Sequence, residues 1–353
     1  MMQRVRRILA MTCAALGVLA AGGVASAAAT LVYGTGGFPT TPPKLPAAEW
    51  VWSAKDNGQS PRRLARGVAP LVSPNGRLVV YEIFTRNAQR LEVVPAAGGR
   101  SRRLLGNVQD GGVVAWSPDS RTVAAVTGRE LGTKRLILID VASGTVRRTV
   151  ASAPDFGAVS FSPRGDRLVY ARTVGRQGSD LYTAGVSGGR PVALTRDHNS
   201  LAPVWGPRWI VFSRSRPSSH RNDAPKLDLY LVKPSGTGLH RLTHTNPGYL
   251  LAGLVATAWS ADGRRLLAEF TGQDTSYAET VDPVTGRVRR LGTPAQGLIG
   301  AGLSRDGTTV LATTGGPDPG DSDVVAVPYT GGRLRTLAPH ARMPDWNAVR
   351  APR

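Results

Sequence analysis

A short turn motif recurs along the chain at nearly constant spacing. Its clearest copies begin with Ser and lie at 73–76, 117–120, 162–165, 260–263 and 304–307. Pro presets the second position of such a turn, Asp or Asn hydrogen-bonds to its own backbone, and Gly accepts a positive φ. The residue before each turn sets the register: Val72, Trp116, Phe161, Trp205 (before a shortened turn), Trp259, Leu303 and, near the C-terminus, Trp346. Successive register residues are 44, 45, 44, 54, 44 and 43 positions apart, which chance does not produce.

Each repeat also contains a second hairpin, so it holds four short strands, A to D. The second turns are rich in Gly and lie at 97–99, 143–144, 187–189, 235–236, 285–286 and 330–332. A four-stranded sheet every 40 to 50 residues is typical of a propeller blade, which must pack against neighbouring blades to bury its faces. The 42 Gly and 26 Pro residues also favour many turns over helices. The sequence therefore predicts an all-β fold, a single β-propeller of four-stranded blades.

The two ends of the chain supply complementary parts of one further blade. Trp346 marks a strand A that no strand B, C or D follows. At the N-terminus, Leu31–Tyr33 is similar to the strand B at Leu168–Tyr170, while Trp50–Trp52 and Arg63–Leu64 resemble strands C and D without a preceding strand A. Pairing of these strands would close the ring and remove its open edges. We predict seven blades; the alternative is six blades, with the N-terminal segment as an extension.

The first residues have the pattern of a secretory signal peptide. Arg4, Arg6 and Arg7 precede an apolar run from Ile8 to Ala20, and Ala25–Ala27 forms an A-x-A cleavage site. We predict cleavage after Ala27, with an uncleaved membrane anchor as the alternative.

The predicted domain organisation has three parts: a signal peptide at 1–27, an N-terminal strand and Pro-rich segment at 28–48, and the propeller at 49–349. The single cysteine, Cys13, lies in the leader. The mature chain would therefore have no disulfide, no cysteine-ligated metal and no thiol nucleophile. No later stretch is long and apolar enough to span a membrane after cleavage.

The chain is strongly basic, with a formal net charge of +20. Loss of three leader arginines would leave +17 on the mature chain. A positive field attracts anions, so acidic envelope polymers, anionic lipid headgroups and nucleic acid are candidate partners. Without a dense basic run or a basic motif interleaved with aromatic residues, we expect no specific nucleic-acid binding. Codon bias in a GC-rich genome is an alternative origin for part of the arginine excess.

The repeats resemble the WD40-like propeller repeats of the TolB family. The shared pattern is a strand, a Ser-Pro-Asp-Gly turn and a strand, followed by a strand such as Leu229–Val232 and a blade end such as Leu194-Thr195 or Arg241–Thr243. The resemblance covers roughly residues 49–347. It implies a β-propeller that acts as a protein-interaction platform on the envelope side of the membrane.

Three short motifs that suggest chemistry are better explained as turns or loops. Gly185–Gly189 matches the G-x-S-x-G nucleophile elbow but occupies the turn between strands C and D. Arg164–Asp166 spells an adhesion tripeptide within a turn between strands A and B, and Asp318, Asp321 and Asp323 lack the spacing of a calcium loop. We therefore predict no catalytic residue, no metal and no cofactor.

Histidines gather on one predicted face. The B–C and D–A loops of a propeller lie together, and the longest insertions, near 215–226 and 244–255, project there. Loops that depart from a repeat commonly carry binding sites. The candidate binding residues on this face are Asp110, Asp155, Asp197, His198, His220, His244, Tyr249, His340 and Arg342.

We therefore predict a monomeric, non-catalytic propeller, secreted or located in the periplasm or cell envelope. It would bind an envelope protein or another ligand through this face. One alternative is a hydrolase or lyase with Asp110, Asp155, Asp197 and His198 converging at the central channel. The other is adhesion to an anionic envelope polymer, which salt would weaken steeply.

Overall fold

The fold is all-β, as predicted. The computed structural model describes residues 29–36, 49–84, 89–108, 114–128, 132–175, 178–216, 226–245, 251–272, 275–315 and 321–347. These residues form 28 strands and one short 3-10 helix, η1 (Pro294–Gln296). The predicted signal peptide and most of the Pro-rich segment lie outside the described residues. Among the described residues, no helix has the length and apolar character needed to cross a bilayer.

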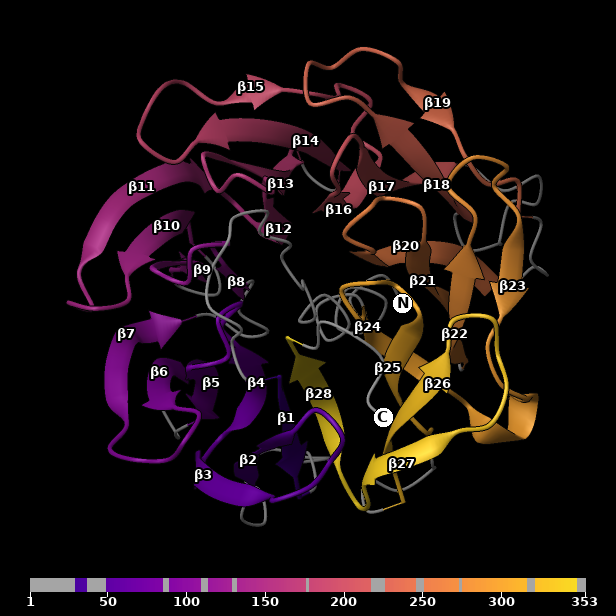
Figure 1. Ribbon diagram of the computed structural model, residues 1–353. Coiled ribbons are helices and arrows are strands. Elements are labelled where there is room, and N and C mark those ends of the chain that lie inside the picture. Colours follow the sequence, from indigo (N-terminus) through magenta and orange to yellow (C-terminus); the bar gives the residue numbers. More distant parts are fainter. Residues whose placement is uncertain are drawn as a thin grey trace.

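The strands follow one another in antiparallel sets of four arranged around a centre (Figure 1). The innermost strands, A, are β4 (Val68–Val72), β8 (Val114–Trp116), β12 (Phe156–Phe161), β16 (Ser200–Trp205), β20 (Leu251–Trp259), β24 (Ile299–Leu303) and β28 (Arg342–Trp346). The B strands are β1 (Thr30–Thr35), β5 (Leu78–Phe84), β9 (Thr122–Thr127), β13 (Arg167–Val174), β17 (Ile210–Arg216), β21 (Leu266–Gly272) and β25 (Thr309–Thr313).

The outer half of each set consists of strands C and D. The C strands are β2 (Trp50–Lys55), β6 (Gln89–Pro95), β10 (Lys134–Asp140), β14 (Gly178–Gly185), β18 (Lys226–Val232), β22 (Ser276–Val281) and β26 (Val324–Pro328). The outermost strands, D, are β3 (Arg62–Arg66), β7 (Arg102–Val108), β11 (Val146–Ala153), β15 (Val192–Ala193), β19 (His240–Arg241), β23 (Val288–Arg290) and β27 (Arg335–Ala338). Single residue pairs, Val108 with Thr127 and Leu227 with Gly253, join neighbouring sets into larger sheets.

The first and last strands lie in the same sheet, whose order is β28-β1-β2-β3. Leu31 pairs with Trp346 and Val32 with Asp345, although more than 300 residues separate them in the sequence. These are the segments that the sequence assigned to one blade from both termini. This pairing is the one on which the prediction of seven rather than six blades depends.

The repeated turn has the side-chain bonds that its residue types predict. In the copy at 117–121, Ser117 Oγ donates to Asp119 Oδ1 over 2.6 Å and accepts from Thr122 N over 2.9 Å. Asp119 Oδ1 also accepts from Arg121 N over 3.0 Å. The copies at 260–265 and 304–309 repeat these bonds. The motif therefore recurs in these copies because Ser and Asp cap the turn from within.

The register residues hold neighbouring blades together. Trp116 is 3 % exposed, and its Nε1 donates to Leu71 O of the preceding blade over 3.1 Å. Trp259 Nε1 makes the equivalent bond to Val204 O over 3.3 Å. The aromatic side chains thus bury apolar surface between blades while the indole nitrogen has a partner. Their role is packing between blades.

Arginines on the outermost strands form a second set of contacts between blades. Five sheets have an Arg near the same position of strand D. Arg62, Arg102, Arg148 and Arg335 each pair with the third residue from the end of strand C. Arg289 pairs with the second residue from the end. Arg148 Nη1 and Nη2 donate to Gly185 O (2.6 Å) and Gly189 O (2.9 Å) in the next C–D turn. Arg102 reaches Val141 O, and Arg335 Nη2 donates to Asn57 O over 3.2 Å. Arg102, Arg148 and Arg335 thus bind their blades to the C–D turn of the next blade.

Candidate functional site

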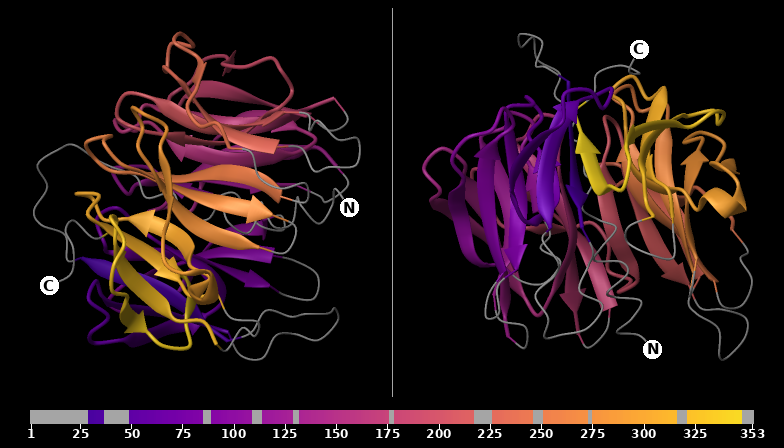
Figure 2. Two further views of the ribbon diagram at one scale, coloured as in Figure 1. Left: turned by 90° about the vertical axis from the view of Figure 1, so that its right-hand side faces the viewer. Right: turned by 90° about the horizontal axis from the view of Figure 1, so that it is seen from below.

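The propeller has two faces with different connections. Because the four strands of a blade run antiparallel in sequence, the B–C and D–A loops emerge on one face, which we call the loop face. The A–B and C–D turns emerge on the other, which we call the turn face. Figure 2 shows the strands running across the thickness of the disc between these faces.

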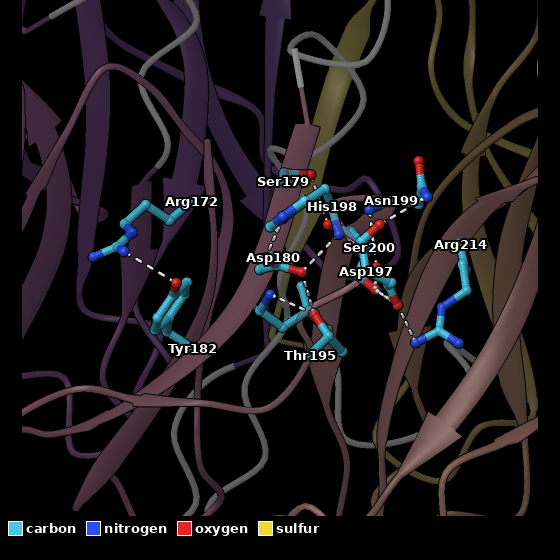
Figure 3. A network of polar contacts seen from close by, with 11 residues as sticks. Arg172, Ser179, Asp180, Tyr182, Thr195, Asp197, His198, Asn199, Ser200 and Arg214 are labelled. Atoms are coloured by element: carbon cyan, nitrogen blue, oxygen red, sulfur yellow. Dashed lines mark hydrogen bonds and ion pairs between the residues drawn. The ribbon is translucent and has the colours of Figure 1, made fainter. Parts of the chain in front are cut away.

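A buried aspartate holds the histidine at the centre of the candidate site (Figure 3). Asp180 Oδ2 lies 2.7 Å from His198 Nδ1, and Asp180 Oδ1 accepts from His198 N (3.0 Å) and Thr195 Oγ1 (3.1 Å). The Asp180 side chain is 3 % exposed, whereas that of His198 is 65 % exposed. Since the carboxylate binds Nδ1, the opposite ring edge with Nε2 faces away from it. His198 also has a φ of 58°, a left-handed conformation that these bonds help to fix.

Asp197 organises the same loop from its other side. Its carboxylate accepts from Asn199 N (2.8 Å) and Ser200 Oγ (2.9 Å) and forms an ion pair with Arg214 Nη2. The Arg214 guanidinium lies 4.7 Å from the centre of the Tyr230 ring. The loop between β15 and β16 is therefore fixed by two carboxylates, and it presents His198 between them.

The neighbouring blade has an equivalent buried aspartate, Asp228, which is bound by threonine and arginine instead of histidine. The Asp228 side chain is fully buried and accepts from Thr245 N (2.8 Å), Arg216 Nε (2.8 Å) and Arg241 Nη2 (2.7 Å). Burial tends to raise the pKa of Asp228, but the bonds from Arg216, Thr245 and Arg241 outweigh it and leave the pKa below its ordinary value. Asp228 is thus a charged anchor for the D–A loop.

Asp180 and Asp228 were not among the residues predicted from the sequence, and Asp323 was predicted only as a loop aspartate. Asp180 and Asp228 each precede Leu-Tyr in strand C, and Asp323 precedes Val-Val just before β26. Asp323 Oδ1 accepts from His340 N over 3.0 Å. The recurrence of Asp directly before the apolar part of strand C was the pattern that could have identified them.

The other predicted binding residues have separate surroundings. Asp155 pairs with Lys134 Nζ over 2.8 Å. Arg342 Nη2 pairs with Glu49 Oε1 over 3.2 Å, and both side chains are largely buried. Burial raises the pKa of Glu49 to about 7 despite the neighbouring Arg342. His244 and His340 are exposed. Asp110, His220 and Tyr249 lie outside the described residues.

The structure thus brings Asp197 and His198 together but not with Asp155, the third described acid or base of the channel hypothesis. Among the described residues, no group of three His, Cys, Asp or Glu side chains could hold a metal ion. The arrangement around His198 offers an exposed imidazole edge, a guanidinium and a fixed loop backbone. These are groups that bind polar partners by hydrogen bonds.

Comparison with known proteins identifies the fold. No protein-family model and no curated protein sequence matches the chain. TolB from Acinetobacter baumannii is similar in structure, with a TM-score of 0.55, 18 % sequence identity and coverage of 86 % of this chain and 81 % of that one. The fold is a TolB-like β-propeller.

Enzymes share this propeller fold. The β-propeller domain of the Trilobed protease from Pyrococcus furiosus has a TM-score of 0.62 at 14 % identity and covers 83 % of this chain and 88 % of that domain. An oligogalacturonate lyase in complex with manganese has a TM-score of 0.57 at 15 % identity, covering 76 % of each chain. At these identities the likeness establishes architecture, and function must be argued from the site.

Proposed function

We propose that this chain is an exported, non-catalytic propeller that binds a protein of the cell envelope through its loop face. The observation that carries the proposal is the state of the carboxylates on that face. Asp180, Asp197 and Asp228 are each occupied by backbone, hydroxyl or basic donors of the chain itself. They act as anchors that fix the loops around His198.

A fixed loop with an exposed imidazole suits recognition better than acid–base chemistry by these carboxylates. A side chain that acts as a general acid or base must be able to reach the atom to which it gives, or from which it takes, a proton. The carboxylate of Asp228 is fully buried, and that of Asp197 is paired with Arg214. His198, in contrast, has a preorganised orientation, which reduces the entropy lost when a partner binds.

Export is inferred from the leader. Cleavage after Ala27 would release a chain with no further apolar span in its sequence. We expect expression in a bacterial host to give a protein outside the cytoplasm. Its intact mass should correspond to a chain that begins at Ala28. Recovery of the uncleaved chain in the membrane fraction would instead support an anchored form.

Site-specific photocrosslinking tests partner binding. A photoreactive amino acid at position 198 samples the loop face, and one at Arg208 samples the exposed turn face as a matched control. We expect a discrete crosslinked envelope protein from position 198 that unlabelled wild-type protein competes away. Competitor carrying Arg214→Ala should compete less well, because Arg214 holds Asp197 and its loop. The same crosslinks from both positions, or equal competition by the variant, would contradict the proposal.

The lyase alternative has a direct assay. The lyase with a similar fold acts, by its name, on oligogalacturonate. We expect no unsaturated product when this chain is incubated with oligogalacturonate, with or without added Mn²⁺. Product formation that His198→Ala abolishes would overturn the non-catalytic assignment and place a reaction at the loop face.

A further inference from the structure

The turn face presents arginines at positions that the repeat determines. Arg100, Arg190 and Arg333 each follow Gly-Gly in a C–D turn, and Arg287 follows Thr-Gly in another. Exposed arginines also occur in the A–B turns, at Arg77, Arg121, Arg164, Arg208 and Arg264. Equivalent positions in successive blades place these charges around a ring at one end of the disc. The turn face is therefore a broad basic surface.

The aspartates of the same turns, Asp56, Asp119, Asp140, Asp166, Asp262, Asp282 and Asp306, offset part of this charge but are fewer than the arginines. None of Arg77, Arg100, Arg121, Arg190, Arg287 or Arg333 forms an ion pair with another described residue. The seven D strands contain no Asp or Glu, and six of them contain Arg. The arginines that bind neighbouring turns donate to backbone carbonyls, which are neutral, so their charge also contributes to the field. Asp140 and Asp262 do form ion pairs here, with Arg147 and Arg264.

Aliphatic side chains accompany the arginines. Val146, Val192, Leu239 and Val284 are 49 %, 58 %, 43 % and 89 % exposed. Each lies in or directly beside the C–D turn of one of four consecutive blades. Of the large apolar side chains exposed among the described residues, Phe84 alone lies elsewhere. Basic and apolar side chains thus share the same end of the blades.

We propose that the turn face docks on the surface of an anionic lipid bilayer. Arg side chains would bind the headgroup phosphates, since the guanidinium fork matches phosphate oxygens. The aliphatic tips would enter the interfacial region, as amphipathic surface elements do. A planar array of charges with apolar tips fits a bilayer better than a linear polymer. Among the described residues, no Phe, Tyr or Trp side chain that could stack on nucleic-acid bases is exposed on the turn face.

This docking leaves the loop face directed away from the lipid. The two faces are opposite ends of the same strands, so contact of one with a membrane keeps the other accessible (Figure 2). The inference rests on the turn face alone and is independent of the partner proposed for the loop face. Each proposal can fail without the other.

Vesicle co-sedimentation tests the docking. The protein, its N-terminus verified by intact mass, is mixed with vesicles of phosphatidylcholine alone or of phosphatidylcholine with phosphatidylglycerol, over a range of salt. We expect binding to the anionic vesicles only and a steep loss with salt. Each surface arginine contributes about fivefold in partitioning, so Arg100→Gln with Arg190→Gln should weaken binding about 25-fold.

A matched double variant separates a docking face from net charge. Arg135→Gln with Arg196→Gln removes the same charge from exposed positions at the loop face. We expect it to change partitioning by less than twofold, whereas Val284→Asn should weaken partitioning without changing its salt dependence. Equal losses from the two double variants, or equal binding to neutral vesicles, would overturn the proposal. Binding to soluble polyphosphate without vesicle binding would overturn it in favour of a polymer.

Discussion

Asp345 makes the stability of the ring joint depend on pH. It lies in β28, 8 % exposed, and its Oδ2 accepts from Val72 N of the next blade over 2.8 Å. Burial raises its pKa from 3.8 to about 7, more than the bonds from Val72 and Trp346 lower it. Between these two pH values the folded protein keeps a proton that the unfolded chain releases. Stability therefore falls as the pH rises from about 4 to about 7.

The pKa difference sets the size of this effect. One pKa unit corresponds to 1.36 kcal/mol, so the rise from 3.8 to about 7 limits the loss to about 4 kcal/mol. Asp345→Asn removes the titration but keeps an oxygen that can accept from Val72 N. We expect the variant to gain stability relative to the wild type at pH 8, up to that limit, and to gain little or nothing at pH 4.

Urea unfolding followed by tryptophan fluorescence measures the difference at each pH. Asp321→Asn is the control, because Asp321 is an exposed aspartate on the loop between β25 and β26. It should leave the pH profile of unfolding unchanged. A free-energy difference between wild type and Asp345→Asn that is the same at pH 4 and pH 8 would refute the reasoning. So would a variant that is less stable than the wild type at pH 8 only.

Two further predictions concern side-chain contacts. Arg148→Ala should cost about 2 kcal/mol of unfolding free energy, because it removes two charged hydrogen bonds to the next blade. Arg147→Ala is the control and should cost less than 1 kcal/mol, because the Arg147 side chain is exposed and pairs only with Asp140. Equal costs of the two variants in thermal and urea unfolding would contradict the role of Arg148. Asp228→Asn should lower the free energy of unfolding by about 3 kcal/mol, because Arg216 and Arg241 lose the carboxylate that they share. It should also increase proteolytic cleavage after β19. Unchanged stability and cleavage would contradict the role of Asp228 as an anchor.

The sequence predicted the strands well because repetition reports local chemistry. The turns that begin at Ser117, Ser260 and Ser304 have the same Ser–Asp cap, so the spacing of the motif revealed the hairpins directly. Placement of Leu31–Tyr33 as a strand B followed from its likeness to a later blade, and the structure pairs Leu31 with Trp346. Local patterns of this kind therefore locate strands even where the repeats are only weakly similar in sequence.

The candidate site was less predictable because its contacts cross between strands. Loop membership placed Asp197 and His198 on one face, but it could not show that Asp180, from a different strand, binds the imidazole. It also grouped Arg342 with exposed residues, although Glu49 binds it in a largely buried pair. Which side chains meet depends on the tilt and reach of neighbouring blades, and periodicity does not report either.

The arginine content shows how a compositional feature divides into distinct structural roles. Codon bias would scatter arginine without regard to register, yet five blades place it near the same D-strand position, as at Arg148. There the length and fork of the side chain let it reach two carbonyls of the next turn, which a lysine ammonium would not match. At the tips of the turns, as at Arg190, a positive charge near the protein surface is enough to attract an anionic surface. Charge on the outermost strands also discourages pairing of their open edges with other chains. Net charge alone therefore gives no measure of binding, whereas register separates the arginines that join blades from those available to an anionic surface.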